Sequence, residues 1–414
     1  MKRILAVVLL IVTVTICSAL ALRAGAADKF ETLYKFVSIS QGARPEAPLA
    51  RDSGGNLYGT TSWDGTVFEL EPNSDGSWSE SVLYNFGKGN QDGGNYPEGP
   101  LTLDSAGNLY GTLPDGGAKG LGMVYELTPD GGGTWTKNVL YSFCSLSNCA
   151  DGSGSFSGVI FDQKGNLYGT TSVGGRNGPG TVFKLAPNGS GGWTESVIYD
   201  FPANGSDGLL PLAGLIFDNA GNLYGTTAGG GLYHGGTVFR LSQSKDGTWT
   251  HAKLYQFCRL KNCPDGGNPY AGVIFDSAGN LYGTTKGGGT HGVGVVFQLS
   301  PTAEGQWNEK VLHQFTGGDD GALPLGGVTF DSTGRLYGTA SEGGSDSCPG
   351  GGCGTVFSLA KDSNGVWQET TIREFGLPAA HPAAGLIFSQ GVLYGTTAGW
   401  PKGDNFGSVY EVIP

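Results

Sequence analysis

Residues 214–227 read GLIFDNAGNLYGTT, and this stretch recurs with variations along the chain. The glycine after its tyrosine, Gly225, has counterparts at Gly59, Gly111, Gly169, Gly283, Gly338 and Gly395. The intervals between these glycines are 52, 58, 56, 58, 55 and 57 residues, so the repeat is about 56 residues long. Self-similarity at such a period indicates an array of supersecondary units, one per repeat. The chain therefore contains seven units.

Each unit has room for four short strands. The unit that begins at Gly214 predicts strands at 215–218, 223–227, 237–241 and 253–257. The first two are joined by a tight turn that contains Gly221, where a positive φ is expected. Four antiparallel strands per unit form the blade of a β-propeller. We therefore predict an all-β, seven-bladed β-propeller with four antiparallel strands per blade.

The two ends of the chain predict how the ring closes. The last unit contains three predicted strands, of which 408–412 is the third. The segment 31–36 near the N-terminus is similar to fourth strands elsewhere, such as 80–86. We predict that this N-terminal strand completes the C-terminal blade, which leaves no open sheet edge. Six tryptophans precede fourth strands and agree with this arrangement: Trp78, Trp135, Trp193, Trp249, Trp307 and Trp367.

The composition excludes other classes of protein. A mainly helical protein is not expected, because the 414 residues include 76 Gly and 20 Pro. Each glycine inside a helix costs about 1 kcal/mol relative to alanine. Collagen is excluded because glycine does not recur at every third residue. Disordered chains are poor in aromatic residues, whereas this chain has 8 Trp, 17 Tyr and 20 Phe to bury.

The N-terminus has the parts of a secretory signal peptide. Lys2 and Arg3 precede an uncharged run from Ile4 to Leu22, and the small residues of 24–26 follow. We predict a signal peptide over residues 1–26 and a propeller over residues 27–414. An uncleaved membrane anchor is the alternative, because the uncharged run is 19 residues long.

Removal of residues 1–26 would change the net charge from −12 to −15, because the segment contains three basic residues and no acid. An acidic exported chain lacks the basic surface on which nucleic-acid binding depends. It is also poorly suited to anionic membrane surfaces. We expect a monomer that is secreted, periplasmic or on the cell surface, with no membrane span after cleavage and no nucleic-acid partner.

Six of the seven cysteines form three pairs of one spacing, each with four residues between the two cysteines. In an oxidising compartment this pattern predicts three local disulfides. Zinc sites usually need two such pairs brought together, and free thiols are the remaining alternative. The predicted bonds are Cys144–Cys149, Cys258–Cys263 and Cys348–Cys353.

Units of the form G-x-I-F-D-x-x-G-N-L-Y-G-T-T…G-G…G-T-V-F-x-L resemble the Gloeo/Verruco repeat. Over residues 30–414 the chain is similar to the choice-of-anchor tandem repeat GloVer-containing proteins. The resemblance implies an exported bacterial protein. Members of that family often end in a C-terminal anchoring segment. This sequence ends at Pro414, directly after a predicted third strand, so we expect no such anchor.

Residues repeated in nearly every blade are expected to be structural, because one site does not need seven copies. This applies to Tyr58 and its counterparts, to the tryptophans, and to a first series of aspartates at the ends of first strands. These aspartates precede tight turns, where Asp accepts backbone N–H bonds. They are Asp52, Asp104, Asp162, Asp218, Asp276 and Asp331.

A second series of aspartates precedes glycine between the fourth strand of one blade and the first strand of the next. A ring of carboxylates there could bind Ca²⁺, which takes several oxygen ligands. The alternative is ordinary Asp-Gly turn chemistry, which the sequence favours. The candidate metal ligands are Asp92, Asp151, Asp207, Asp265 and Asp320.

The loops between second and third strands differ most among the repeats. In a propeller they share a face with the loops between blades, around the central channel. Aromatic and cationic side chains there could bind a protein, peptide or glycan, although variable surface loops also drift without function. The candidate ligand-binding residues are Trp63, Arg176, Tyr233, His234, His291 and Trp400.

Catalytic motifs are not evident. The five histidines occupy different repeat positions without metal-ligand spacing, and no G-x-S-x-G or phosphate-loop motif is present. We predict a non-enzymatic binding or interaction module that uses the loop-rich face. The alternative is an enzyme at the channel mouth, lactonase-like or lyase-like and dependent on Ca²⁺. A purely structural envelope protein is a third hypothesis.

Overall fold

The computed structural model describes residues 29–39, 42–87, 94, 96–345, 347–348, 351–399 and 406–414. The predicted signal peptide, Asp92 and Trp400 lie outside the described residues.

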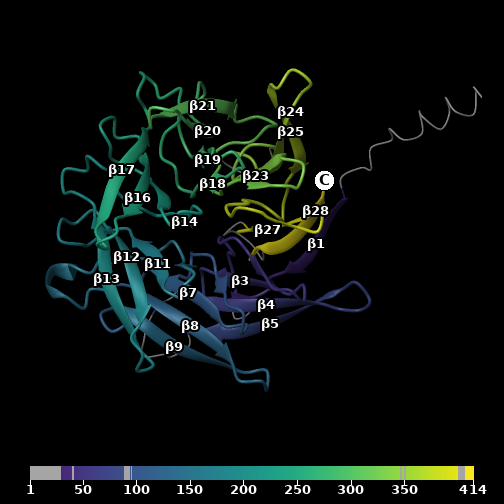
Figure 1. Cartoon of the computed structure of the whole chain (residues 1–414). Coiled ribbons are helices and arrows are strands. Elements are labelled where there is room, and N and C mark those ends of the chain that lie inside the picture. Colours follow the sequence, from purple (N-terminus) through teal and green to yellow (C-terminus); the bar gives the residue numbers. More distant parts are fainter. Residues whose placement is uncertain are drawn as a thin grey trace, which may run out of the picture.

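Seven four-stranded antiparallel sheets surround a common axis, as a seven-bladed propeller (Figure 1). Blades one to six take their strands from the chain in sequence order, from the axis outward. In blade seven the order is β26-β27-β28-β1, so the N-terminal strand lies beside the C-terminal one. The predicted fold and the predicted closure are both confirmed.

The two inner strands of each blade are short and apolar. First strands contain only two or three residues: β2 (Ala50–Arg51), β6 (Thr102–Leu103), β10 (Ile160–Phe161), β14 (Ile216–Phe217), β18 (Ile274–Phe275), β22 (Thr329–Phe330) and β26 (Ile387–Ser389). Second strands are fully buried, apart from Val392, because neighbouring blades cover both of their faces: β3 (Leu57–Thr61), β7 (Leu109–Leu113), β11 (Leu167–Thr171), β15 (Leu223–Thr227), β19 (Leu281–Thr285), β23 (Leu336–Ala340) and β27 (Val392–Thr397).

The outer two strands become progressively more exposed. Third strands are mostly buried, with a half-buried fourth residue in all but β24 and an exposed last residue: β4 (Thr66–Pro72), β8 (Met123–Pro129), β12 (Thr181–Pro187), β16 (Thr237–Gln243), β20 (Val295–Pro301), β24 (Thr355–Lys361) and β28 (Ser408–Ile413). Fourth strands alternate in exposure over their first three or four residues, as expected of an outer strand with one solvated face: β1 (Lys29–Lys35), β5 (Trp78–Asn85), β9 (Trp135–Ser142), β13 (Trp193–Asp200), β17 (Trp249–Gln256), β21 (Trp307–Gln314) and β25 (Trp367–Glu374).

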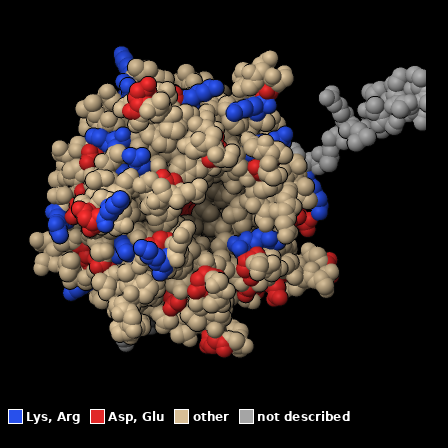
Figure 2. Space-filling model, viewed as in Figure 1, with Lys and Arg blue, Asp and Glu red and all other residues tan. Residues whose placement is uncertain are grey.

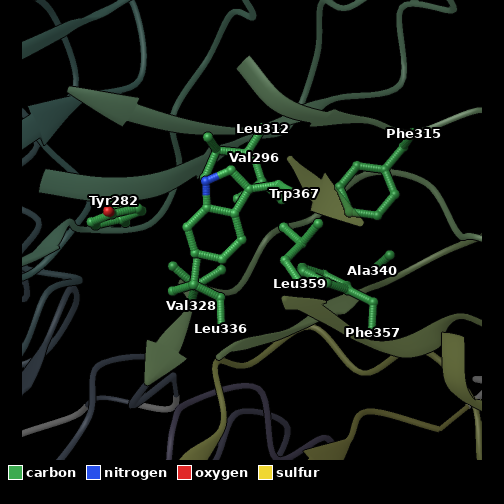
Figure 3. Close-up of a cluster of buried hydrophobic side chains, with 10 residues drawn as sticks. All are labelled: Tyr282, Val296, Leu312, Phe315, Val328, Leu336, Ala340, Phe357, Leu359 and Trp367. Atoms are coloured by element: carbon green, nitrogen blue, oxygen red, sulfur yellow. The ribbon is translucent and has the colours of Figure 1, made fainter. Parts of the chain in front are cut away.

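The core consists of seven apolar clusters, one at each junction between blades. Figure 3 shows the junction of blades five and six, where Trp367 packs between the two blades, beside Tyr282. At every junction an aromatic ring after one fourth strand meets the third-strand aromatic ring of the next blade. Phe257 and Phe297, for example, contact edge to face with ring centroids 5.0 Å apart. The six repeated tryptophans are therefore packing residues, each at a different junction between blades.

The glycine of each second strand is required by this packing. A Cβ atom on Gly225 would lie 2.6 Å from the ring of Phe239 and 2.8 Å from Leu215, closer than real Cβ atoms approach other atoms. All six counterparts of Gly225 face a third-strand Phe or Tyr ring in the same way. The repeated glycine therefore provides room for an aromatic ring.

The first aspartate series holds the turn between first and second strands, as predicted. Asp218 Oδ1 accepts a hydrogen bond from the backbone N–H of Asn222 at 2.9 Å. Its Oδ2 accepts bonds from the Asn222 amide at 2.7 Å and from the Tyr224 hydroxyl at 3.1 Å. One carboxylate thus connects the turn to the second strand.

The three predicted disulfides are present, at Cys144–Cys149, Cys258–Cys263 and Cys348–Cys353. Such bonds persist in oxidising surroundings, so they suggest an extracellular or otherwise oxidising environment. Within the described part of the chain, no helix has the length and apolar character needed to cross a bilayer.

Candidate functional site: the mouth of the central cavity

The loops between blades and the loops between second and third strands share one face, as predicted. In blade four, Leu209 and Gly229 exchange backbone hydrogen bonds of 2.7 and 3.0 Å. Equivalent bridges join Ser153 to Val173, Gly267 to Gly287 and Ala322 to Glu342. The two kinds of loop therefore form one hydrogen-bonded layer over this face.

The described ligand-binding candidates lie outside the central cavity. Trp63 and Tyr233 are each 40% exposed. Arg176 contacts Asp200, and His291 Nδ1 lies 3.1 Å from the Thr290 hydroxyl. His234 is exposed at a left-handed position with a φ of 62°. The structure does not bring these side chains together at the cavity, so a binding role for them stays a prediction.

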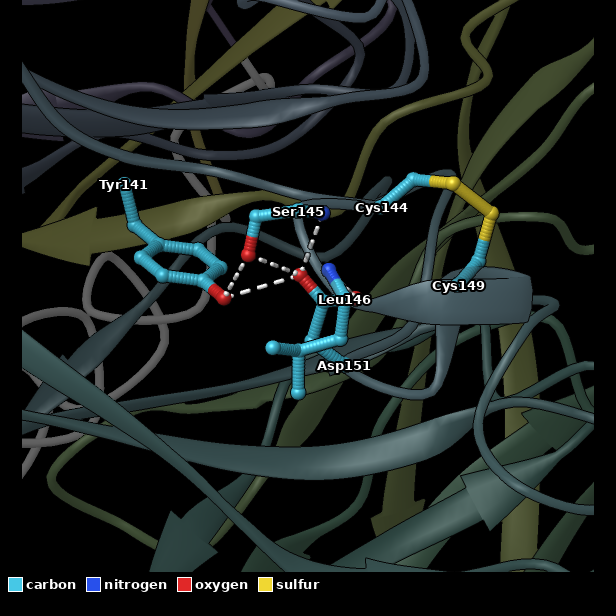
Figure 4. Close-up of a disulfide and its surroundings, with 6 residues drawn as sticks. All are labelled: Tyr141, Cys144, Ser145, Leu146, Cys149 and Asp151. Atoms are coloured by element: carbon cyan, nitrogen blue, oxygen red, sulfur yellow. Dashed lines mark hydrogen bonds between the residues drawn. A yellow bond between two sulfur atoms is a disulfide. The ribbon is translucent and has the colours of Figure 1, made fainter.

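The second aspartate series is bound by its own loops. Asp151 is fully buried, and its carboxylate accepts bonds from the Tyr141 hydroxyl at 2.8 Å and from the backbone N–H groups of Ser145 and Leu146 at 2.8 and 3.2 Å (Figure 4). These bonds fix the loop that the Cys144–Cys149 disulfide closes. The carboxylate thus stabilises the chain between two blades.

The other described members of the series have similar partners. The Tyr199 and Tyr255 hydroxyls donate to Asp207 and Asp265 at 2.6 and 2.9 Å. His313 Nε2 lies 3.1 Å from the carboxylate of Asp320. Among the residues that the structure describes, no three His, Cys, Asp or Glu side chains are grouped as a metal ion would require. Calcium binding by these loops stays a prediction.

Three of these aspartates face a glutamate on the fourth strand of the next blade. Burial, followed by the charges of Asp151 and Asp200, raises the pKa of Glu195 to about 8. Burial and the charge of Asp265 raise the pKa of Glu309 to about 7. Glu369 is raised to a pKa of about 7 by burial and by Asp320. These pairs lie at the outer strands, away from the axis, and we expect them to make junction stability depend on pH.

The central cavity lies on the axis of the ring and has a volume of about 750 Å³. Figure 2 shows the hollow at the centre of the molecule. Its wall consists of the segments that lead into the first strands, such as Ala213–Ile216 and Ala271–Ile274. Threonines of second strands tie these segments across blades: Thr226 Oγ1 donates to the Ala271 carbonyl at 2.9 Å. The wall is therefore held in place by inter-blade hydrogen bonds.

One residue per blade forms a ring at the cavity mouth, which we call the mouth ring. Each member follows a proline in six blades and Ser155 in blade three. In five blades the residue before that proline is a non-glycine residue with a φ between 51° and 59°. The mouth ring, in blade order, consists of Glu46, Glu98, Phe156, Leu212, Tyr270, Leu325 and Ala383.

The mouth ring is acidic on one side and apolar on the other. In blade one, Arg44 donates to Glu46 at 2.8 Å, and the Ser62 hydroxyl donates to the other oxygen of Glu46 at 2.7 Å. Desolvation of the carboxyl, followed by the charge of Glu46, raises the pKa of Glu98 in blade two. Glu98 has no hydrogen bond or ion pair with the described residues. The Glu98 residue as a whole is exposed, although part of its carboxyl is desolvated, so the acidic side has one carboxylate that a ligand can reach.

On the opposite side, one lysine lines the cavity among the residues that the structure describes. Lys286 follows the second strand of blade five and lines the cavity. Its ammonium group lies 4.9 Å from the centre of the Tyr270 ring, a cation–π distance. The equivalent residue in every other blade is small or a proline: Ser62, Pro114, Ser172, Ala228, Ser341 and Ala398. Lys286 therefore differs in type from its counterparts in the other six blades, and it lines the cavity.

The mouth ring is not among the predicted ligand-binding residues, because those residues lie in the longest and most variable loops. Lys286 is not among the ligand-binding residues that the sequence predicts. A usable signal was present in the segment before each first strand, where the residue after the proline varies between acidic, aromatic and aliphatic types. The residues directly before and after this position are small or apolar in every repeat. Variation confined to one position indicates that the side chain there contacts something other than the repeated core.

Comparison with solved structures supports the fold. Virginiamycin B lyase from Staphylococcus aureus aligns with 94% of this chain and 99% of its own, at 11% identity and a TM-score of 0.55. An ancestral GH74 enzyme aligns over 90% of this chain and 48% of its own, at 13% identity and a TM-score of 0.60. PorZ, a surface component of the type-IX secretion system of Porphyromonas gingivalis, aligns over 88% and 46%, at 15% identity and a TM-score of 0.50. At these identities the similarity shows the fold alone.

A family model for the Gloeobacter/Verrucomicrobia repeat matches residues 21–150, 136–349 and 251–414, in three overlapping regions. Among curated proteins, no sequence match is found.

Proposed function

The chain belongs to the Gloeobacter/Verrucomicrobia repeat family, and we propose that it is an exported, non-enzymatic binding module that holds a small molecule in its central cavity. Export is supported by the three disulfides and by the signal peptide that the sequence predicts. The observation that carries the binding role is the mouth ring.

The mouth ring varies where the rest of the blade is repeated. Its apolar members Phe156, Leu212 and Leu325 line a cavity of about 750 Å³, within the range of small-molecule sites. A few polar groups, chiefly Glu98 and Lys286, accompany them. Apolar walls with a small number of placed polar groups are typical of ligand pockets.

The inter-blade hydrogen bonds of the cavity wall support a pre-formed site. Thr284 Oγ1 donates to the Gly326 carbonyl at 2.9 Å, and Thr339 Oγ1 to the Ala384 carbonyl at 2.8 Å. A wall held in this way loses little conformational freedom when a ligand enters, which favours affinity. Trp63, Arg176, Tyr233, His234 and His291 would extend such a site outward onto the loops.

The uncharged apolar dye Nile red tests this function. We expect saturable binding at one site per chain, with a rise in fluorescence. Ala383→Phe should weaken binding by at least about tenfold, because it adds bulk at a ring position that accommodates Phe156 in blade three. Lys310→Ser, on an exposed part of β21, is the control and should bind the dye like the unmodified protein. Absence of saturable binding, or equal binding by Ala383→Phe, would contradict the proposal.

Catalysis at the mouth is a second candidate, favoured by one observation. Glu46 and Glu98 are close enough for the charge of one to raise the pKa of the other. A carboxyl with a raised pKa beside an ionised one can act as general acid and base. Turnover of lactone or uronic-acid glycan substrates, lost in Glu98→Gln, would support an enzyme. Unchanged substrate in every assay, with Nile red bound, favours the binding module.

A further inference from the structure

We propose that the central cavity takes a zwitterionic molecule with an apolar body, namely a short hydrophobic peptide with free ends. Its ammonium group would lie at Glu98 and its carboxylate at Lys286. This inference rests on the proposed function, because it names the class of ligand for the same cavity.

The two charged groups stand on opposite sides of the axis. Glu98 belongs to blade two and Lys286 to blade five, and blades three places apart in a ring of seven face each other across the channel. A ligand that reaches both must span the mouth. Because both groups lie in the wall of one cavity, a single molecule with two opposite charges can satisfy them together.

The charge of each side agrees with this orientation. The charges of Glu46 and Asp115 raise the pKa of Glu98, and the charge of Arg44, which is ion-paired with Glu46, lowers it. That corner therefore has an excess of negative charge and favours an ammonium group. Lys286 has a Tyr270 ring as its neighbour and no carboxylate partner among the described residues. An incoming carboxylate would give it one.

Most of the wall between the two charged groups is apolar; the exception is the Arg44–Glu46 pair of blade one. Phe156 and Leu212 occupy blades three and four on one side of the line from Glu98 to Lys286, and Leu325 and Ala383 occupy blades six and seven on the other. Aliphatic side chains of a peptide could bury against both arcs, which would remove apolar surface from water. A highly polar sugar would leave these arcs without apolar partners.

The repeat itself supplies substitutions that the fold accepts. Glu98→Leu places at blade two the residue that blades four and six have at this position, Leu212 and Leu325. Lys286→Ser places at blade five the residue of blades one, three and six, Ser62, Ser172 and Ser341. Loss of binding in these variants would therefore reflect loss of a charge rather than loss of the fold.

Calorimetric titration with four forms of trileucine tests the inference: free ends, an acetylated amino end, an amidated carboxyl end, and both ends blocked. We expect the free peptide to bind at least about tenfold more tightly than either singly blocked form. Glu98→Leu should lose the preference for a free amino end and retain the preference for a free carboxyl end. Lys286→Ser should show the reverse pattern, and Lys310→Ser should behave like the unmodified protein.

The outcomes separate this inference from the proposed function. If Nile red binds and Ala383→Phe weakens it, but blocked and free trileucine bind equally or neither binds, the cavity function stands and the zwitterionic ligand is wrong. If neither the dye nor any peptide binds, both are wrong. Charge preferences that Glu98→Leu and Lys286→Ser leave unchanged would also overturn the inference, because the recognising groups would lie elsewhere.

Discussion

The guanidinium carbon of Arg373 lies 4.3 Å from the centre of the Phe30 ring. Arg373 belongs to β25 in blade six, and Phe30 belongs to the N-terminal strand that completes blade seven. The same ring contacts Phe375 and Tyr410, with centroid distances of 5.8 and 5.6 Å. Phe30 therefore joins three segments at the point where the chain closes its ring.

Phe30→Ala tests the closure. Loss of this partly buried ring should lower the free energy of unfolding by about 2–4 kcal/mol, because large-to-small changes remove apolar contacts and leave a cavity. Chemical denaturation monitored by tryptophan fluorescence measures the change. Lys35→Ala, on an exposed position of the same strand, is the control and should shift stability by about 0.5 kcal/mol or less. Equal stability of the Phe30 variant would show that the N-terminal strand does not hold the ring.

Gly225→Ala tests the packing of the second-strand glycine against Phe239. We expect a loss of about 1–3 kcal/mol, as for overpacked cores. Gly132→Ala is the matched control, since a Cβ there meets no atom within 4 Å and its φ is not in the left-handed region. It should leave stability unchanged or raise it by about 0.4–1 kcal/mol. Similar effects of the two changes would indicate that the glycine has another role.

Glu195 makes the stability of one junction depend on pH. Its pKa rises from 4.5 to about 8 on folding, so the folded state holds the proton more tightly than the unfolded chain does. Ionisation of the buried carboxyl destabilises the folded state. This loss of stability is absent below about pH 4.5 and grows until about pH 8. Glu195→Gln should match the unmodified melting temperature at pH 4.5. It should exceed that temperature at pH 8.5, by an amount that corresponds to roughly 1–2 kcal/mol, because residual water access reduces the full shift.

The exposed Glu304→Gln is the control for this experiment and should not change the difference between the two pH values. If Glu195→Gln has the same effect at both pH values, the carboxyl is not held protonated by the junction.

Asp151→Asn separates the two interpretations of the second aspartate series. If the carboxylate holds its own loop, the change should cost about 1–3 kcal/mol, because charge-assisted hydrogen bonds to Tyr141 and Ser145 are weakened. Millimolar Ca²⁺ should then leave the melting temperature of the unmodified protein unchanged. A metal site would be supported if Ca²⁺ raised the melting temperature of the unmodified protein but not that of Asp151→Asn. An ion that binds only the folded state must stabilise that state.

Much of the architecture could be predicted because its signals are local and repeated. Asp218, Asn222 and Tyr224 lie within seven residues, and their turn recurs in six blades. Each disulfide joins cysteines five positions apart. The predicted ligand-binding residues, such as Tyr233 and His291, are conspicuous side chains in variable loops. Those loops extend over the face, whereas the cavity is lined by the segments that reach the innermost strands.

The sequence by itself determined the number of blades, the strands of each blade and the closure by the N-terminal strand. Seven copies of one pattern fix the number of blades and the strands of each. The last copy lacks a fourth strand, and the strand-like segment near the N-terminus is the part of the sequence that matches it. Only the tertiary structure decided which side chains share the cavity. Glu98 and Lys286 are 188 positions apart in the sequence, and they meet one cavity because ring closure places one segment of every blade on a common axis.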